Sequence, residues 1–120
     1  MAMFIDVTPM PGIGRYQLNK AVIIEGVKVP ALFTWDGESV PGFLWPIIGS
    51  PFELRFMVPS MVHDYLYGMG DASGFTRKQA DRLFKKLLMA NGVDEERADT
   101  MYSGVRVGGR GHYNLGNIPA

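Results

Sequence analysis

The sequence predicts an α+β fold: a small N-terminal antiparallel sheet followed by about three helices, two of which form an antiparallel hairpin. Short runs rich in β-branched and aromatic residues, separated by turn residues, fill the first part of the chain. All but one of the eight prolines lie at or before position 59, and the last is at 119. Because proline interrupts helices and strand ladders, long helices belong between those positions. Apolar residues recur there at helical spacing.

The expected strands are short and end before residue 36. They are residues 3–7, 15–18, 21–29 and 31–35. Gly26 with Val27 predicts a bend that folds the third run back on itself, and Asp36 with Gly37 predicts a turn after the last strand. The apolar segment 40–52 is cut by three prolines, so it is expected to be irregular and to pack over the core.

The first helix is expected from about Leu54 to Tyr67. Pro59 lies within these limits, so either the regular helix begins near it, where proline is tolerated, or the helix is kinked there. Thr76 and Gln79 match the capping box that begins a helix, in which each side chain bonds the backbone amide of the other residue.

The second helix continues through apolar residues at helical spacing and is expected to end at Gly92. Asp94 then caps a third helix, with Glu95 and Glu96 favourably placed in its first turn. Gly108 with the following glycine ends it.

The chain is expected to form a single domain over residues 1–120. It divides into a part of mainly strands and turns (1–53), a helical part (54–108) and a loop or arm (109–120). Twelve basic residues balance twelve acidic ones, which disfavours non-specific nucleic-acid binding. Cysteine is absent, so disulfides, thiolate metal sites and cysteine nucleophiles are excluded. No apolar run approaches the ~20 residues that span a bilayer and no secretory signal pattern is visible, so a soluble protein without a transmembrane segment is expected.

Lys78, Arg82 and Lys85 lie opposite the apolar stripe of the second helix, with Lys86 nearby. A solvated charged face is the default interpretation, and a docking surface for an acidic partner is the alternative. Arg77 differs, because it projects close to a residue one turn later, Asp81, and could pair with it.

The candidate catalytic residues are His63 and Asp81. On a helix, His63 and Asp64 point about 100° apart, so they are not expected to pair with each other. A short loop makes the first two helices antiparallel neighbours, which brings Asp81 near His63. Asp81 would then hold the Nδ1–H group of His63 while Nε2 faces a cleft, as in a general base. The alternative is a satisfied polar cluster that joins two helices.

Four further polar residues are candidates for holding a cation or polarising a substrate: Asp36, Ser39, Asp64 and Tyr67. Carboxylate and hydroxyl oxygens suit calcium or another divalent cation. The identity of the metal, and whether one binds, stay open at this point.

Five motifs together resemble an uncharacterised family of small proteins from tailed bacteriophages and prophages, a domain of unknown function. They are an Asp-Gly-x-Ser-x-Pro turn, a Trp-Pro segment, a His-Asp-x-Leu-Tyr helix, an Ala-Asp-x-x-Phe helix and a Met-Tyr-x-x-Val-Arg helix. The residues are Asp36, Gly37, Ser39 and Pro41; Trp45 and Pro46; His63, Asp64, Leu66 and Tyr67; Ala80, Asp81 and Phe84; and Met101, Tyr102, Val105 and Arg106. The resemblance extends from about Val29 to Gly109.

The resemblance implies a phage-encoded virion- or tail-associated protein, located in the virion or the host cytoplasm. Its partners would be other virion proteins or a host protein, and a homo-oligomer is compatible with such a role. A hydrolase-like site at His63 is compatible with this role. A purely structural or assembly protein is one alternative, and a small factor that binds and inhibits a host protein is the other.

A second similarity is local. A His-Asp pair followed by tyrosine on one helix, with an aspartate on an antiparallel helix, is similar to the core of calcium-dependent secreted phospholipases. By that similarity His63 would be the base, Asp64 the calcium ligand and Asp81 the residue that orients the histidine. Those enzymes also rely on disulfides and on a glycine-rich calcium loop just before the helix, and this chain has no cysteine and no such loop at that point.

Overall fold

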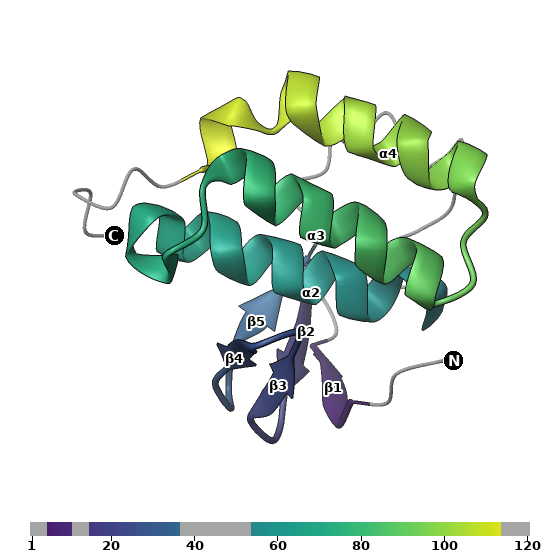
Figure 1. Ribbon diagram of the computed structural model, residues 1–120. Coiled ribbons are helices and arrows are strands. Elements are labelled where there is room, and N and C mark those ends of the chain that lie inside the picture. The colour runs from purple at the N-terminus through teal and green to yellow at the C-terminus, as the bar shows by residue number, and fades with distance from the viewer. Residues whose placement is uncertain (1–4, 11–14, 37–53, 114–120) are drawn as a thin grey trace.

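The computed structural model describes residues 5–10, 15–36 and 54–113. Within these ranges two small antiparallel sheets precede three α-helices, so the predicted α+β fold is confirmed. The helices are α2 (Leu54–Met69), α3 (Arg77–Ala90) and α4 (Glu95–Gly108). The strands lie against one side of α2, while α3 packs on its other side and α4 lies beyond α3 (Figure 1).

The first sheet has the strand order β1-β2-β5, and the second pairs β3 with β4. The strands are β1 (Val7–Met10), β2 (Arg15–Leu18), β3 (Val22–Ile24), β4 (Val27–Val29) and β5 (Thr34–Trp35). The strand expected at residues 3–7 is wrong in its bounds, because β1 begins at Val7 and contains Pro9. Proline is accommodated there since β1 is an edge strand.

Two other strand predictions change in detail. The bend between β3 and β4 is Glu25-Gly26, whose φ angles are 51° and 80°, and Val27 is already the buried start of β4. Positive φ at both central residues matches the two-residue turns that suit the twist of a hairpin. The strand expected over 31–35 shortens to Thr34–Trp35, because Leu32 has a φ of 71° and breaks the extended backbone.

The helices confirm most of the expected limits. α2 begins at Leu54, passes through Pro59 and ends at Met69, so the regular helix does not start at the proline. The Thr76 side chain accepts a hydrogen bond from the Gln79 amide, and the glutamine side chain accepts from the Thr76 amide, which confirms the capping box of α3.

The remaining helix ends also agree with expectation. Gly92 has a φ of 93° just after α3, a conformation that suits glycine. The Asp94 side chain accepts from the Arg97 amide and so caps α4. The C-terminal loop or arm is more ordered than expected at its start, because η3 (Arg110–His112) forms a 3₁₀ turn directly after α4.

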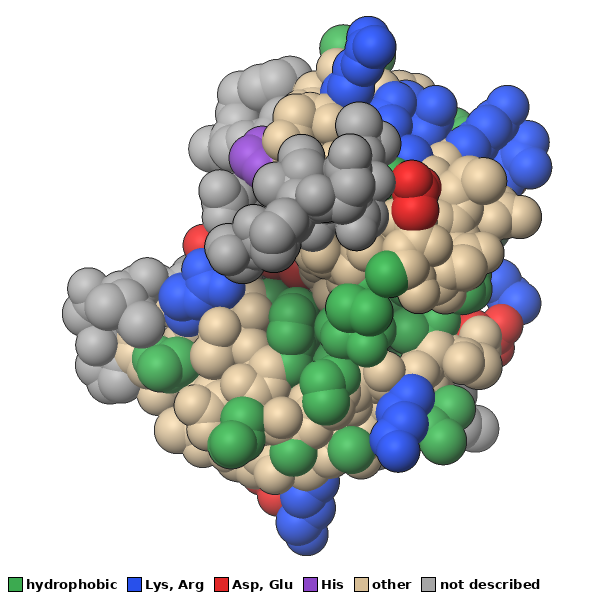
Figure 2. Space-filling view, turned by 90° about the vertical axis from the view of Figure 1, so that its left-hand side faces the viewer, with side chains coloured by type: hydrophobic (Ala, Val, Ile, Leu, Met, Phe, Trp, Pro, Cys, Tyr) green, Lys and Arg blue, Asp and Glu red, His purple; other side chains and the backbone are tan. Residues whose placement is uncertain are grey.

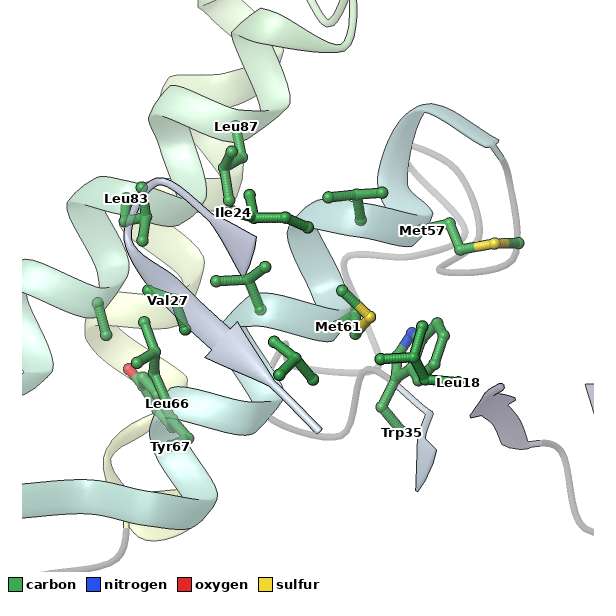
Figure 3. Close-up of a cluster of buried hydrophobic side chains, with 14 residues drawn as sticks. Leu18, Ile24, Val27, Trp35, Met57, Met61, Leu66, Tyr67, Leu83 and Leu87 are labelled. Carbon is green, nitrogen blue, oxygen red and sulfur yellow. The ribbon is translucent and has the colours of Figure 1, made fainter. Parts of the chain in front are cut away.

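Two groups of buried apolar side chains hold these layers together. One lies between the sheets and α2, where Trp35 and Leu18 pack near Met57 and Met61 (Figure 3). The other joins α2, α3 and α4, and includes Phe56, Phe84, Leu88, Met101 and Val105. The helix hairpin formed by α2 and α3 therefore contributes to both groups, and it carries the candidate site.

Several predictions fall on positions outside the described residues. These are the irregular segment 40–52, the Trp45-Pro46 pair, Gly37 and Ser39. Among the helices that the structure describes, none combines the length and the apolar character needed to cross a membrane.

Candidate functional site

His63 lies in the second half of α2 and its side chain has no solvent exposure. Tyr67 follows it by four residues, so both side chains occupy one face of the helix. The imidazole is enclosed between two aromatic rings, with centroid distances of 4.2 Å to Tyr67 and 4.6 Å to Phe84. The expected cleft beside the ring is therefore absent on these two sides of His63.

Asp81 lies on α3 and is also fully buried. Its Oδ1 atom is 2.7 Å from Nε2 of His63 and accepts the hydroxyl proton of Tyr67 at 2.5 Å. The structure thus brings His63 and Asp81 together across the helix hairpin.

The expected ring orientation is wrong, because Asp81 bonds Nε2 and not Nδ1. Nε2 is the distal nitrogen of the ring, whereas Nδ1 lies beside Cβ and close to its own helix. Packed helix axes are about 8–10 Å apart, so the distal atom is the one that reaches a carboxylate on the neighbouring helix.

Two arginines approach the other oxygen of Asp81, Oδ2. Nη1 of Arg106, on α4, donates to it at 2.7 Å, and Nη1 of Arg77 lies 3.7 Å away. Arg77 also donates to the Tyr67 hydroxyl at 3.3 Å and to the backbone oxygens of Val105 and Arg106, each at 3.1 Å. One carboxylate therefore links side chains from all three described α-helices.

The sequence reasoning anticipated Arg77 near Asp81 but missed Arg106 as a partner. The signal that could have found it is the last motif of the family resemblance, where Arg106 directly follows the buried Val105. A buried aspartate needs a cationic or hydrogen-bonding partner. Arg106 on α4 is that partner, because it lies within hydrogen-bond distance of Asp81.

The hydrogen bonds decide the ionisation of Asp81. Burial alone would raise its pKa, but bonds from His63, Tyr67 and Arg106 outweigh burial and hold the pKa of Asp81 below its usual range. The pKa of Tyr67 is raised, chiefly by burial and then by its bond to Asp81. Asp81 is therefore a carboxylate and Tyr67 a neutral phenol at neutral pH.

This charge state fixes the tautomer of a neutral His63. A carboxylate only accepts hydrogen bonds, so Nε2 of His63 must carry the proton that bonds Asp81. In the neutral ring the lone pair then resides on Nδ1. Such a ring has the electronic form of a general base, with Nδ1 as the proton acceptor.

The other sequence candidates gather on the adjacent face of α2. Asp64 and Tyr67 line a cavity of about 290 Å³, together with Asp36. The Asp36 amide donates to Oδ2 of Asp64 at 3.4 Å, and Nη1 of Arg15 donates to Oδ2 of Asp36 at 3.0 Å. As expected, Asp64 turns away from His63 and serves a separate surface.

The described residues contain no group of three or more acidic, histidine or cysteine residues placed to hold a metal ion. The calcium ion implied by the phospholipase similarity therefore meets no cluster of three such side chains in this part of the chain, and Ser39 lies outside it. Calcium takes 6–8 oxygen ligands, and the Asp36 and Asp64 carboxylates supply only part of such a set.

Tyr113 is a residue that the sequence reasoning missed. Its ring meets Tyr67 edge-on with a centroid distance of 5.3 Å, and its hydroxyl donates to the backbone oxygen of Phe75 at 2.6 Å. These contacts hold the end of η3 over the end of the helix hairpin. No sequence pattern marks this contact, because it joins residues that lie far apart along the chain.

The basic row on α3 is exposed in large part, as its default interpretation requires. Lys85 forms an ion pair with Asp99 on α4, and Lys86 bonds Glu25 at 2.5 Å. The side of the molecule seen in Figure 2 shows hydrophobic side chains gathered across its middle, with Lys and Arg mostly toward its margins.

A family model described as "Protein of unknown function (DUF1353)" matches residues 15–105. Uncharacterized protein y4jT of Sinorhizobium fredii (strain NBRC 101917 / NGR234) is 34% identical over 104 residues, which are 82% of this chain and 29% of that protein. Uncharacterized protein y4iH of the same strain is 30% identical over 70 residues, which are 58% of this chain and 28% of that protein. The chain thus spans less than a third of the length of these curated relatives. No solved structure matches it.

Proposed function

The chain belongs to the DUF1353 family of proteins of unknown function, and we propose that the site around Asp81 is that of a hydrolase whose general base is His63. The observation that carries this proposal is the 2.7 Å contact between Nε2 of His63 and Oδ1 of Asp81, with the Tyr67 hydroxyl on the same oxygen. A buried carboxylate that orients a histidine is one part of the arrangement used in general-base catalysis, and access of a substrate to the ring is the other.

In the proposed reaction Nδ1 of His63 removes a proton from a water molecule as the water oxygen attacks an ester carbonyl carbon. The tetrahedral intermediate then collapses, the bond between that carbon and the ester oxygen breaks, and the proton passes from Nδ1 to the leaving alkoxide. The products are a carboxylic acid and an alcohol. Asp81 stabilises the imidazolium that forms between the two steps, and no step is assigned to a metal ion.

A substrate must also be able to reach Nδ1 of His63. The ring is enclosed by Tyr67 and Phe84, so a substrate reaches it only after a neighbouring side chain moves. Tyr67 belongs both to the Asp81 network and to the wall of the 290 Å³ cavity. The cavity is therefore the side from which a substrate would approach.

The test uses two substitutions of His63 that differ in which ring nitrogen they imitate. The amide nitrogen of His63→Gln takes the place of Nε2 and retains a donor for Asp81, whereas that of His63→Asn takes the place of Nδ1 and loses the contact. Hydrolysis of p-nitrophenyl esters and of phosphatidylcholine vesicles is measured with calcium and with a chelator. We expect His63→Gln to fold but to lose at least about a hundredfold in kcat. Wild-type activity in folded His63→Gln, or no hydrolysis by the wild type, would overturn the proposal.

A second candidate is a purely structural or assembly protein, and the enclosure of His63 favours it. Asp81 and His63 have no exposure, and Asp81 also bonds Arg106. In this case the network joins three helices without performing a reaction. The same pair of variants distinguishes it: His63→Gln would then be fully functional in assembly and His63→Asn would be unstable.

The phage setting expected from the sequence is retained as a proposal, with the chain acting in or on a virion or tail. Support comes from the motif combination, whose residues run from Asp36 to Arg106 and include positions on all three described α-helices. Mass spectrometry of purified particles tests it: detection of the chain at a fixed copy number supports the virion role. Absence from particles, together with a host protein that co-purifies stoichiometrically from infected cells, would instead indicate the inhibitor role.

A further inference from the structure

An open groove lies between α3 and α4, away from the Asp81 network. The two helices are antiparallel neighbours (Figure 1), and the groove between them has a volume of about 500 Å³. This volume is within the range of sites that bind small ligands or side chains. The lining includes Arg82, Lys85, Lys86 and Met89 from α3 and Asp99 and Tyr102 from α4.

Helical spacing gives the two walls of the groove a fixed order. Residues three or four positions apart lie on one face of a helix, so each wall is a single row of side chains. The ion pair between Lys85 and Asp99 sets the two rows against each other. The rows are Lys78, Arg82, Lys85 and Met89 on α3, and Glu95, Asp99 and Tyr102 on α4. One end of the groove is therefore basic, and the other contains Met89 and the acidic first turn of α4.

Two cations at the basic end are not neutralised. Lys85 and Lys86 are each matched by a carboxylate, and Glu95 also attracts Lys85. The side chains of Arg82 and Lys78, by contrast, make no hydrogen bond or ion pair within residues 5–10, 15–36 and 54–113. Arg82 lines the groove and Lys78 lies one turn before it, so an anionic ligand group meets unmatched positive charge at this end.

Apolar surface is exposed beside these charges. Met89 is 42% exposed, although methionine is a residue that proteins usually bury. Tyr102 is half-buried, and its hydroxyl makes no hydrogen bond in the part of the chain that the structure describes. Methionine adapts its shape to different partners, and arginine, tyrosine and methionine are enriched in protein interfaces. The groove thus has the composition of a surface that binds protein segments.

The order of the charges favours a peptide over a nucleic acid. Met89 lies seven residues after Arg82 on α3, which is about 10 Å along a helix and about three residues of an extended chain. A phosphate polymer would bring negative charge along the whole groove, including the part beside Glu95 and Asp99, where it is repelled. A peptide places a carboxylate at Arg82 and an apolar side chain further along. A flat membrane surface does not enter a groove.

We propose that the groove between α3 and α4 binds an acidic peptide segment of a partner protein, with a carboxylate at Arg82 and an apolar side chain over Met89 and Tyr102. This inference goes beyond the proposed hydrolase and does not depend on it. Peptide binding should therefore be unchanged in His63→Gln, and the failure of either proposal leaves the other intact.

The binding experiment uses the full chain and three synthetic peptides with blocked ends. The first, Glu-Glu-Ala-Leu-Phe-Leu-Ala-Glu-Glu, has carboxylates on both sides of an apolar centre, so it fits in either chain direction. The second replaces every glutamate by glutamine, and the third replaces Leu-Phe-Leu by three serines. Each peptide is titrated into the protein and followed by two-dimensional NMR.

We expect the first peptide to bind with a Kd of about 1 mM or lower, with chemical-shift changes at Arg82, Met89 and Tyr102. The second and third peptides should bind at least about fivefold more weakly, because each lacks one of the two contacts. No saturable binding of the first peptide, or equal binding of all three, would overturn the proposal.

Two charge reversals locate the ionic contact. Arg82→Glu should fold as the wild type does, by thermal melting, because Arg82 has no ionic partner among the described residues. It should bind the acidic peptide about tenfold more weakly. It should also bind a version with lysine in place of glutamate more tightly than the wild type does. Lys20→Glu is the control, because Lys20 is 80% exposed after β2 and its reversal changes the net charge equally. Equal effects of the two reversals would refute a contact in the groove.

Met89→Gln tests the apolar contact, because glutamine retains the length of the side chain and removes its apolar end. It should weaken binding of the first peptide by about threefold to tenfold and leave binding of the serine peptide unchanged. Wild-type affinity for the first peptide in folded Met89→Gln would contradict the placement of the apolar side chain.

Two further probes represent the rival partners. A single-stranded oligothymidylate and vesicles that contain phosphatidylglycerol are titrated at the same ionic strength, because the attraction between exposed charges depends on salt. Weaker binding of both than of the acidic peptide supports the inference. Tighter binding of the oligonucleotide or of the vesicles would refute it and would indicate a nucleic-acid or a membrane surface instead.

Discussion

His63 and Tyr67 place hydrogen-bonding groups on the same oxygen of Asp81, at 2.7 and 2.5 Å, from adjacent turns of α2. Their i, i+4 spacing makes this convergence a property of the helix. The second carboxylate oxygen is bonded by Arg106 from α4. Asp81 is thereby surrounded by donors on both oxygens, which is how a protein keeps a buried carboxylate ionised.

The stability of the chain should depend on pH through Asp81. Its pKa is lowered from 3.8 in the folded state, so its contribution is complete above that value and is lost as the pH falls through the folded pKa. The free energy of unfolding, measured with urea between roughly pH 5 and pH 2, should therefore decrease steeply toward acid. Asp6→Asn, which changes an exposed aspartate, should retain this slope, and Asp81→Asn should reduce it.

Asp81→Asn removes the negative charge that faces Arg106 and Arg77 and weakens the contact with the buried His63, so unfolding of this variant is one expected outcome. Carboxyl NMR titration of the wild type provides a second measurement. An Asp81 carboxyl that titrates at or above the value of an exposed aspartate would contradict the prediction.

Arg106→Ala should destabilise the fold by about 1.5–3 kcal/mol, the usual range for a hydrogen bond to a charged group. The substitution removes the 2.7 Å bond to Asp81 but leaves the backbone oxygen that accepts from Arg77. Arg97→Ala is the matched control on the same helix, because its side chain is 47% exposed and lies 3.7 Å from Asp94. An exposed pair of this kind contributes at most about 1 kcal/mol. The free energy of unfolding of both variants is measured with urea. Equal decreases in the two variants would contradict the claim that the Arg106–Asp81 hydrogen bond stabilises the fold.

Local patterns predicted the helices more accurately than the strands. The capping box at Thr76 and the cap at Asp94 depend on neighbours within one turn, so the sequence contains the whole signal. The extent of β1 depends on its pairing with β2. That pairing includes Pro9 at the sheet edge, whereas the strand propensity of residues 3–7 predicted a different extent. Contacts set by tertiary packing override propensity in short strands.

In the candidate site, too, local patterns were predicted correctly and the details of tertiary contacts were not. Helical spacing and a short connection sufficed to predict that His63 meets Asp81. The identity of the bonding nitrogen and the depth of burial depend on the distance between two packed helices, which no local pattern encodes. Arg106 lies on α4 and Tyr113 follows η3. Their contacts with α2 and α3 depend on how α4 packs against α3, so the sequence alone did not predict them.

Tyr67→Phe should cost about 1–2 kcal/mol of unfolding free energy, since it removes one buried hydroxyl and keeps the ring. That hydroxyl donates to Asp81 and accepts from Arg77. Tyr65→Phe is the control on the same helix: Tyr65 is half-buried against Phe33, and its hydroxyl makes no hydrogen bond within the described part of the chain. The control should change stability by less than about 0.5 kcal/mol. If both phenylalanine variants are equally stable, the Tyr67 hydroxyl does not support Asp81.

Gly68→Ala and Gly92→Ala should shift stability in opposite directions, although neither added methyl group comes within 4 Å of a described residue outside its own stretch of chain. Gly68 is helical, so alanine should stabilise α2 by about 0.5–1 kcal/mol through a lower backbone entropy in the unfolded chain. Gly92 has a φ of 93°, which an alanine adopts only with strain, and its substitution should destabilise by about 1 kcal/mol or more. Thermal melting of the two variants beside the wild type measures both signs. A loss of stability in Gly68→Ala would contradict the prediction, because the entropy gain in the helix would then be outweighed by a contact at Gly68.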